Sequence, residues 1–308
     1  HTIKLENMVI KSLINDALLP DLAKYGQGKD TLKKIRQELK DLATIDKHYR
    51  RKETSLFPLM NKYGITAPPE VMWGVDDDIR ALIRDAQKVA NQDQVKIDEL
   101  DQVIKKASHE VLEMIFKEEE IMIPMIDEVA NQEDWYNVKN EEKQIGYTLI
   151  REPMNWQPQL PKNSAGPVDV KNLSSFFINF KEGALNLEQL NAILDLLPFA
   201  LTFIDENDKV AYFGGGAAIY PHSKNAIGNS VFSCHTAKSR PLIEKIFKAF
   251  HEGKRDEIEY WFTPKKMGRT LYLRYYAVHD ENGKYLGCLE VAEDITKIQN
   301  LKGEKKKL

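Results

Sequence analysis

Histidine and carboxylate side chains recur on the helices expected in the first half of the chain, where they could bind a metal ion together. His109 and Glu113 are four residues apart, so they lie about 40° apart on one face of a helix. Glu120 lies about 20° from His109, so the three residues could form one inward stripe. Imidazole and carboxylate ligands together suit iron, zinc or manganese, and carboxylate-rich bundles commonly hold two ions.

His48 belongs to another expected helix, and its neighbours fit a metal site less regularly. Its neighbour four residues on is Lys52, which a cation cannot use as a ligand. Glu53 lies about 140° round the helix from His48, so a local distortion would be needed to turn both inward. His1 and Glu6 have the same five-residue offset near the start of the chain.

Amphipathic helices are the elements that would position these residues. Apolar residues recur at spacings of three and four in two segments: Ile10, Leu13, Ile14 and Leu18, and then Ile79, Leu82, Ile83 and Ala86. Breakers separate such segments at Gly26, Gly28, Gly64, Pro68 and Pro69. A last helix is expected from Ile97 to Ala130, with a kink near Pro124. Four amphipathic helices predict an antiparallel four-helix bundle across residues 1–147.

The second half of the chain has a different pattern. Four prolines fall within residues 151–167, and proline interrupts both helix and sheet, so we expect a linker across residues 148–184. Residues 185–298 contain two strand patterns, short helices and then three strand patterns. This order predicts a five-stranded antiparallel sheet with helices gathered on one side. Residues 299–308 form a basic tail.

The composition narrows the classes of function. The 308 residues are 42% hydrophobic and 30% charged, and the net charge of −3 gives no indication of a nucleic-acid surface. No apolar run reaches the roughly 18 residues of a membrane span. Two cysteines do not make a disulfide framework, so we expect a cytoplasmic protein. The chain begins with His1 rather than Met, which suggests a fragment of a longer protein.

Two features of the second half could bind a cofactor. Cys234 and His235 are adjacent, and both residue types serve as axial ligands of haem. The alternative is that the pair caps or packs the start of a helix. Tyr212 and Trp261 are among several aromatic residues that could line a pocket, although alternating aromatic residues are also typical of sheet packing.

Specific strings in both halves resemble a known bacterial family. HYRRKETSLFP, KYGITAPPEVMWGVDDDIR and MIFKEEEIMIP resemble a family that joins a hemerythrin-like HHE cation-binding domain to a PAS domain. Four strings in the second half resemble the PAS part. They are LPFALTFIDENDKVAYF, the Ile-Gly that begins at residue 227, the Ser-Cys-His that begins at residue 233, and LEVAEDIT. The resemblance spans essentially the whole chain.

The resemblance implies a four-helix bundle that holds two iron ions, or another metal, between imidazole and carboxylate ligands. Carried over by position, the ligand candidates are His1, His48, His109, Glu113 and Glu119. Asp76 stands where family members tend to have a histidine, and a carboxylate can replace imidazole on iron. With Glu53, these residues form the predicted metal site. The PAS resemblance implies a role in sensing a small molecule, haem, flavin or redox state, or in forming a homodimer.

Three functions remain open on this basis. The first is a cytoplasmic sensor whose metal responds to oxygen, nitric oxide or redox state, with the PAS domain as a second input or a dimer surface. The second is a diiron enzyme that reduces oxygen, peroxide or nitric oxide. The third is a metal-free interaction scaffold, in which Lys52 and Asp76 mark a lost site. The expected partners are a metal ion, a small molecule and a second copy of the chain, without nucleic acid or membrane.

Overall fold

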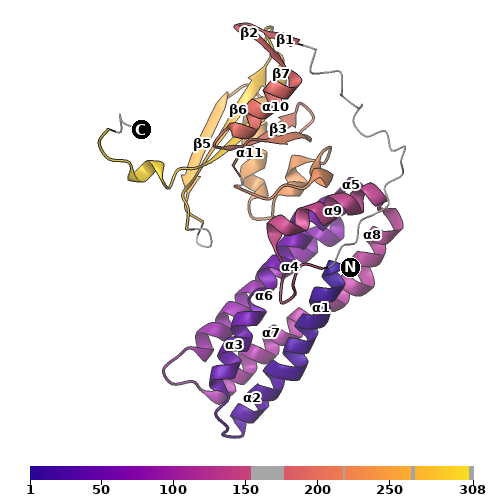
Figure 1. Ribbon diagram of the computed structural model, residues 1–308, viewed down its shortest axis with the longest axis vertical. Helices are drawn as coiled ribbons and strands as arrows, with labels where there is room; N and C mark the ends of the chain where they lie inside the picture. The colour runs from indigo at the N-terminus through magenta and orange to yellow at the C-terminus, as the bar shows by residue number, and fades with distance from the viewer. Residues whose placement is uncertain (154–176, 218, 265–267, 305–308) are drawn as a thin grey trace. The chain divides into compact units, whose positions relative to one another are not determined.

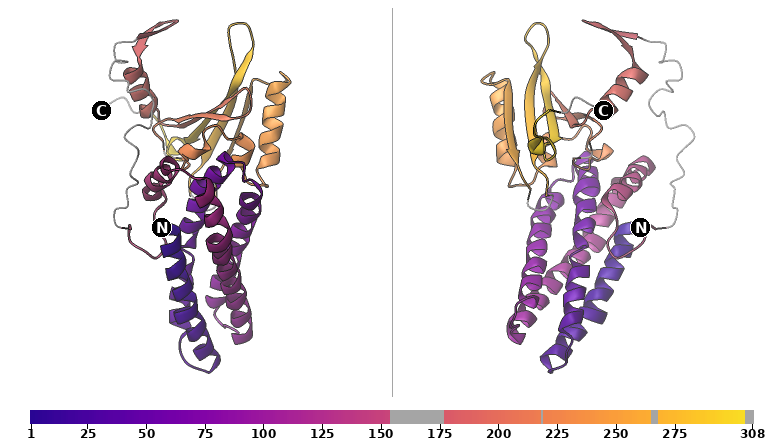
Figure 2. Two further views of the ribbon diagram at one scale, coloured as in Figure 1. Left: turned by 90° about the vertical axis from the view of Figure 1, so that its right-hand side faces the viewer. Right: turned by 60° about the vertical axis from the view of Figure 1, so that its left-hand side comes forward.

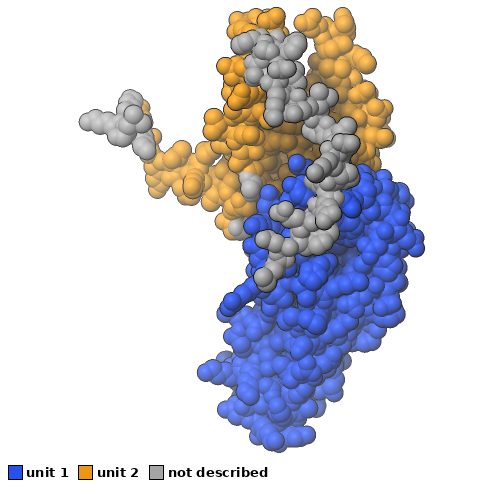
Figure 3. Space-filling model, turned by 45° about the vertical axis from the view of Figure 1, so that its right-hand side comes forward, with its two compact units in different colours: residues 1–159, 223–226 blue, residues 160–222, 227–308 orange. Residues whose placement is uncertain are grey.

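In the computed structural model of the protein, the residues described are 1–153, 177–217, 219–264 and 268–304. The chain divides into two compact units, the first of residues 1–159 with 223–226 and the second of residues 160–222 with 227–308 (Figure 3). Each unit has its own hydrophobic core. Most of the expected linker, at residues 154–176, and the end of the basic tail, at residues 305–308, lie outside the described residues.

The first unit is helical throughout, as predicted (Figure 1). Its α-helices are α1 (Thr2–Ser12), α2 (Leu19–Gly26), α3 (Leu32–Leu42), α4 (Ile45–Arg51), α5 (Phe57–Lys62), α6 (Ala67–Ala90), α7 (Ile97–Lys117), α8 (Ile123–Val129) and α9 (Gln132–Ile145). The long helices α6 and α7 pack against each other, and α3 packs against α6 (Figure 2). Asn131 begins α9 with a capping box that it forms with Asp134.

Three π-helical segments interrupt these helices, and each ends two residues before a proline. The segments are η1 (Leu13–Leu18), η2 (Lys52–Leu56) and η3 (Glu118–Met122), and the prolines are Pro20, Pro58 and Pro124. Proline has no backbone N–H and crowds the preceding turn, so a wider π-helical turn lets the chain continue. The kink expected near Pro124 coincides with η3. Because a π-helical turn adds a residue, η2 and η3 also change which side chains point inward.

The inward face of α7 shows how the core is built. Its buried apolar residues include Ile104, Val111 and Met114, which recur at spacings of seven and three. The same face continues into η3 at Glu118, seven residues after Val111, and that carboxylate is fully buried. The apolar stripe of the helix therefore ends at a buried charge.

The second unit contains the predicted five-stranded antiparallel sheet. Its strands are β3 (Ala200–Asp205), β4 (Val210–Gly214), β5 (Glu257–Phe262), β6 (Leu271–His279) and β7 (Tyr285–Asp294), in the order β4-β3-β7-β6-β5. A separate hairpin of β1 (Phe177–Phe180) and β2 (Gly183–Asn186) precedes helix α10 (Leu187–Leu196). Residues 177–184, which we assigned to the linker, therefore belong to this hairpin.

Helix α11 (Arg240–His251) contributes apolar side chains to the core of the second unit, among them Ile243, Ile246, Phe247 and Phe250. The remaining short helices are 3-10 turns: η5 (Lys224–Ala226), η6 (Val231–Cys234) and η7 (Ile298–Asn300). Among the described residues, no helix has both the length and the apolar character that crossing a membrane requires.

Candidate metal centre and PAS interior

Eight charged side chains meet inside the helical unit, and we refer to them as the buried ion cluster. Its members are Glu6 of α1, His48 and Arg51 of α4, Lys52 and Glu53 of η2, Asp76 and Arg80 of α6, and Glu118 of η3. All eight are between 0% and 9% exposed. Burial of ionised groups is costly unless they are paired, so the contacts within the cluster decide what it can do.

His48 lies between two carboxylates. Its Nδ1 is 2.8 Å from Oε2 of Glu6, and its Nε2 is 3.0 Å from Oε2 of Glu118. Burial disfavours the charged imidazole, but the carboxylates of Glu118 and Glu6 outweigh burial and raise the pKa of His48 to about 9. At neutral pH both ring nitrogens therefore carry a proton and donate to a carboxylate, and neither has a lone pair for a metal.

Lys52 joins two further segments. Its Nζ lies 2.7 Å from Oδ1 of Asp76 and 2.6 Å from Oε1 of Glu118, and 4.5 Å above the centre of the Tyr49 ring. Burial works against the ammonium, but the two carboxylates raise the pKa of Lys52. For Glu118, burial works against the carboxylate, but Lys52 and His48 lower its pKa to about 2. Glu118 therefore uses one oxygen for each of its two cations.

Arginines pair with the other two carboxylates. Arg80 donates to both oxygens of Glu53, at 2.6 and 3.0 Å, and its Nε donates to Asp46 at 2.8 Å. Arg51 donates to Glu6 and to the backbone carbonyl of Gly146. The pair of Arg80 and Glu53 is planar and bidentate, which adds geometric specificity as well as energy.

These residues do not fit the metal that the resemblance implies. The ammonium of Lys52 lies within hydrogen-bonding distance of the carboxylates that a metal would use, and His48 is protonated on both nitrogens. Among the described residues, no group of three or more His, Cys, Asp or Glu side chains is arranged to hold a metal ion. The charge of the buried carboxylates is instead balanced by cations of the chain.

The structure places the seven predicted metal ligands in four environments. His48, Glu53 and Asp76 belong to the buried ion cluster, and the distortion considered for Glu53 is present there as the π-helical segment η2. His109 and Glu113 lie on the exposed side of α7, opposite the apolar face of the helix. Glu119 is half-buried and forms an ion pair with Lys11 at 2.6 Å.

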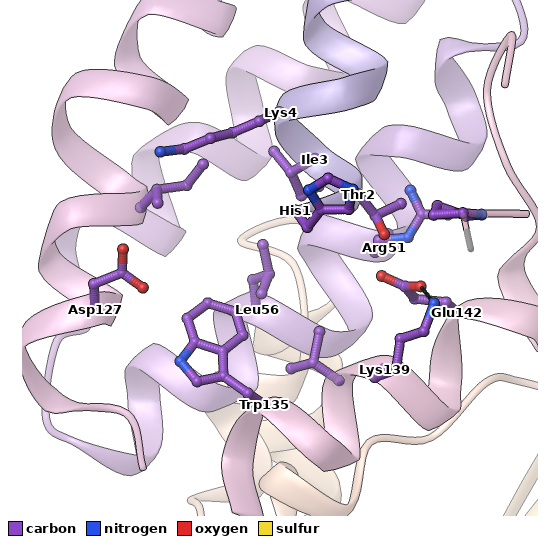
Figure 4. A pocket seen from close by; sticks show the side chains of 13 residues that line it. His1, Thr2, Ile3, Lys4, Arg51, Leu56, Asp127, Trp135, Lys139 and Glu142 are labelled. Carbon is purple, nitrogen blue, oxygen red and sulfur yellow. Dashed lines mark hydrogen bonds and ion pairs between the residues drawn. The ribbon is translucent and has the colours of Figure 1, made fainter. Parts of the chain in front are cut away.

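His1 is exposed and lines a pocket of about 520 Å³ with Trp135 and Glu142 (Figure 4). Arg51 also lines this pocket. Because Arg51 donates to Glu6 within the buried ion cluster, it connects the cluster to the pocket. Lys139 and Glu142 form an ion pair at 2.7 Å at the edge of the pocket. The structure thus does not bring His1, His48 and His109 to one buried point.

Five members of the cluster, Glu6, Arg51, Lys52, Arg80 and Glu118, were not among the ligands predicted from the sequence. Periodicity could have found some of them. Glu118 follows Ile104 and Val111 at intervals of seven, and Arg80 follows Asp76 by four residues on α6. Acidic residues that continue an apolar stripe face the core, whereas His109 and Glu113 continue a polar stripe.

The PAS sheet has an acidic residue on its core-facing side, Glu290, in the middle of β7. Its neighbours on the same face, Cys288 and Ala292, are 0% and 3% exposed, and its partners on the adjacent strands are Thr202 and Tyr275. Burial raises the pKa of Glu290 to about 7, against the effect of its hydrogen bond with Tyr275. Among the described residues no lysine, arginine or histidine forms an ion pair with this carboxyl group.

Three tyrosines lie near Glu290, and the same unit contains a buried histidine. The hydroxyls of Tyr260 and Tyr275 are 3.3 Å apart. Burial and the nearby Glu290 raise the pKa of Tyr220 to about 12. His222 stacks on Phe213 with ring centres 4.3 Å apart, and its buried Nε2 has no hydrogen-bond partner among the described residues. Burial lowers the pKa of His222 to about 4, so the ring is neutral at neutral pH.

The four predicted cofactor residues of the PAS domain belong to three segments: Cys234 and His235 to the end of η6, Tyr212 to β4 and Trp261 to β5. Burial raises the pKa of Cys234 to about 11 at the end of η6, and burial and Arg240 lower the pKa of His235 to about 4. Tyr212 and Trp261 alternate with core-facing residues of edge strands β4 and β5 and point to the other face of the sheet. Trp261 is 64% exposed and contacts Tyr272 edge to face.

Comparison with solved structures found chains that are similar to part of this protein. A crystal structure of a C-terminal domain from Streptococcus mutans is 30% identical over 41% of this chain and 98% of its own, with a TM-score of 0.39. A PAS domain structure from Colwellia psychrerythraea is 22% identical over 36% of this chain and 98% of its own, with a TM-score of 0.29. A crystal structure of a sensory box sensor histidine kinase from Vibrio cholerae is 16% identical over 35% of this chain and 90% of its own, with a TM-score of 0.27. No match was found among curated proteins.

Family comparison assigns each half of the chain. Residues 1–126 match the hemerythrin HHE cation binding domain, and residues 190–296 match a PAS domain. Both matches agree with the resemblance drawn from the sequence strings. The chain therefore joins a hemerythrin HHE cation binding domain to a PAS domain.

Proposed function

We propose that this protein is a sensor or regulator whose PAS domain binds a small organic ligand and whose N-terminal domain is a hemerythrin-like four-helix bundle. The observation that carries the proposal is Glu290. This carboxyl group faces the core of the PAS sheet, keeps some exposed surface, and has no cationic partner among the described residues. An unpaired acid in such a position is unfavourable for folding and is typical of a binding site.

Polar groups beside Glu290 define what the ligand would offer. Thr202 and Tyr275 flank Glu290 on the neighbouring strands, and the unpaired Nε2 of His222 belongs to the same unit. A ligand with a protonated amine or a ring N–H would donate to Glu290. Phe213 pairs with Thr202 in the sheet and offers an aromatic surface to the apolar part of such a ligand.

Binding of an amine would also release a proton from the protein. A positive charge next to Glu290 favours its ionised form, so the pKa of about 7 would fall when the ligand binds. The enthalpy of binding would then depend on the ionisation enthalpy of the buffer. Neutral ligands that bind by shape alone would not show this dependence.

A panel of arylalkylamines, which are protonated at neutral pH, each paired with a neutral isostere, tests this proposal by calorimetry on the full chain. We expect an amine to bind with release of protons, and we expect Glu290→Gln to weaken it by about tenfold or more, which is about 1.4 kcal/mol. Glu293→Gln is the matched control, because Glu293 lies on the same strand and pairs with Arg274 at 3.0 Å. Equal binding by both variants would refute the role of Glu290.

A second candidate function is the iron-dependent sensor that the hemerythrin HHE match suggests. It is favoured by the family match at residues 1–126, which names a cation-binding domain, and by the burial of four carboxylates and one imidazole inside the helical unit. Iron would there respond to oxygen, nitric oxide or redox state. Anaerobic purification, metal analysis and visible spectra before and after addition of air or nitric oxide would test it. Reversible oxo-bridged iron bands would support this function, and turnover with a reductant would support the diiron enzyme.

We further propose a cytoplasmic location and a homodimer through the PAS domain. Both cysteines, Cys234 and Cys288, are free thiols, which suits a reducing compartment. Helix α10 carries exposed apolar side chains, including Ile193 and Leu196, at 45% and 82% exposure. Light scattering on the chain and on a Leu196→Glu variant tests the dimer, which the variant should weaken.

A further inference from the structure

The buried ion cluster contains its own cation at the place where the domain family would lead one to expect a metal. We propose that the ammonium of Lys52 substitutes for a metal ion in this hemerythrin-like bundle, so that the domain folds and holds its shape without metal. This inference does not depend on the ligand proposed for the PAS domain. It rests on the contacts, the charges and the helical geometry of the cluster.

The contacts of Lys52 are those of a bridging cation. Its Nζ joins Asp76 of α6 to Glu118 of η3 from its own segment, η2, at 2.7 and 2.6 Å. It therefore connects three segments of the bundle through carboxylate oxygens. A lysine ammonium has three donors and no lone pair, so it makes these links by hydrogen bonds rather than by coordination.

The cluster contains as many basic groups as acidic groups without an added ion. The carboxylates are Glu6, Glu53, Asp76 and Glu118, and the cations are His48, Arg51, Lys52 and Arg80. Each carboxylate forms at least one ion pair with a cation of this set. A divalent ion placed beside Lys52 would meet a like charge in a medium of low polarity, so it could enter only if Lys52 left or lost its proton.

Local geometry explains how the ammonium reaches this position. His48 and Lys52 are four residues apart, so both point to the inside of the bundle where α4 passes into η2. The π-helical turn then turns Glu53 inward as well, toward Arg80. Lysine is thus held on the core face by the same turn that buries its neighbours, and Tyr49 covers its ammonium.

Removal of the ammonium should convert the cluster into a metal site. In Lys52→Ala, Asp76 and Glu118 lose a shared cation, and a space remains between them. We expect the variant to melt at a lower temperature in the presence of a chelator and to regain stability with Zn(II) or Mn(II). We expect it to bind Zn(II) about tenfold or more tightly than the unaltered chain, which corresponds to about 1.4 kcal/mol.

Lys105→Ala is the matched control, because Lys105 is exposed on α7 and its ion pair among the described residues is with Asp101 of the same helix at 2.9 Å. That variant should behave like the unaltered chain, whose melting temperature should not change with metal. Lys52→Met, which keeps the length of the side chain, should lose stability without gaining a metal response as large as that of Lys52→Ala.

Two results would overturn the proposal. One is stoichiometric retention of iron, zinc or manganese by the unaltered chain after anaerobic loading and desalting. The other is a Lys52→Ala variant that folds but responds to metals no more than the Lys105→Ala control. If Lys52→Ala folds only with metal present, that result supports the proposal, and if it does not fold at all, metal retention by the unaltered chain decides.

Discussion

Glu118 in the hemerythrin-like domain and Glu290 in the PAS domain contrast in their surroundings, although burial also raises the pKa of Asp76, beside Lys52, to about 7. In the hemerythrin-like bundle, Glu118 lies between two cations, Lys52 and His48, at distances of 2.6 and 3.0 Å. In the PAS domain, Glu290 faces the core without an ion pair among the described residues. The pKa of Glu118 falls to about 2, where its cations outweigh burial, whereas burial raises the pKa of Glu290 to about 7.

This difference separates a structural role from a binding role. A buried acid with its own cations has its charge satisfied within the chain, and it holds segments together. A buried acid without a cation is held in an unfavourable state that a ligand could relieve. The resemblance to a metal-binding family points to the first domain as the place where a ligand binds, but the contacts point to the second.

Removal of the shared acid should give the largest change in stability. Glu118→Ala leaves Lys52 and His48 without a common partner in the core, and we expect it to cost about 3–5 kcal/mol in the free energy of unfolding. Urea unfolding followed by far-ultraviolet circular dichroism measures the loss. Glu120→Ala is the control, because Glu120 is exposed two residues further on. A loss as small as that of the control would show that Glu118 is not the centre of the cluster.

Glu290 should make the stability of the PAS domain depend on pH. Its pKa is raised from 4.5 in the unfolded chain to about 7 in the folded chain, so the unfolded chain ionises first as pH rises. Stability is therefore lost between pH 4.5 and 7 and is level above that window. Glu290→Gln removes this loss. The free energy of unfolding of the variant should therefore exceed that of the unaltered chain by an amount that grows as pH rises across the window, to at most about 3 kcal/mol.

Labelling of Cys288 measures this effect in one domain, because both cysteines lie in the PAS unit and Cys288 is fully buried. Mass spectrometry of the labelled peptide at increasing urea gives the unfolding midpoint at each pH. An advantage of Glu290→Gln that is the same at pH 4.5 and pH 8 would contradict the assignment of the pKa of about 7 to Glu290.

The pair of Arg80 and Glu53 should show strong coupling. A double-mutant cycle with Arg80→Met and Glu53→Gln should give an interaction of about 0.5–3 kcal/mol, because both groups are buried and the pair is bidentate. The exposed pair of Lys105 and Asp101 is the comparison, with an expected interaction of about 0.3–0.5 kcal/mol. Equal values for the two pairs would remove the distinction between buried and exposed ion pairs.

The smallest effect is expected where the metal site was first predicted. His109→Ala and Glu113→Ala change exposed residues of α7, and together they should alter the free energy of unfolding by less than about 0.5 kcal/mol. Metal retention should also be the same as in the unaltered chain. A large loss of stability or of bound metal would restore these residues to the site.

The sequence predicted the classes of structure well because they depend on periodicity. Strand patterns and turn residues predicted the five-stranded antiparallel PAS sheet. Apolar residues at spacings of three and four predicted the helical first half. The π-helical segments were not predicted, apart from a kink near Pro124 and a possible distortion at Glu53. They depend on packing around each proline, which local propensity does not describe.

The site was harder to predict for a physical reason. Residue types that bind metals are also the commonest exposed residues of helices, so a stripe such as His109 and Glu113 is ambiguous. Lys52 was set aside because it cannot be a ligand, but a residue that cannot bind a metal can still replace one. Whether a charge is paired depends on contacts between distant segments, such as Lys52 with Asp76 and Glu118.

The protonation state of His48 tests the central claim most directly. Nitrogen NMR of the histidine-labelled chain, assigned with a His48→Gln variant, reports both ring nitrogens at neutral pH. The account predicts that both carry a proton, since each lies within 3.0 Å of a carboxylate oxygen, and that excess Zn(II) or Fe(II) leaves the signals unchanged. A ring nitrogen that is unprotonated and shifts when metal is added would show that His48 is a ligand and would contradict the account.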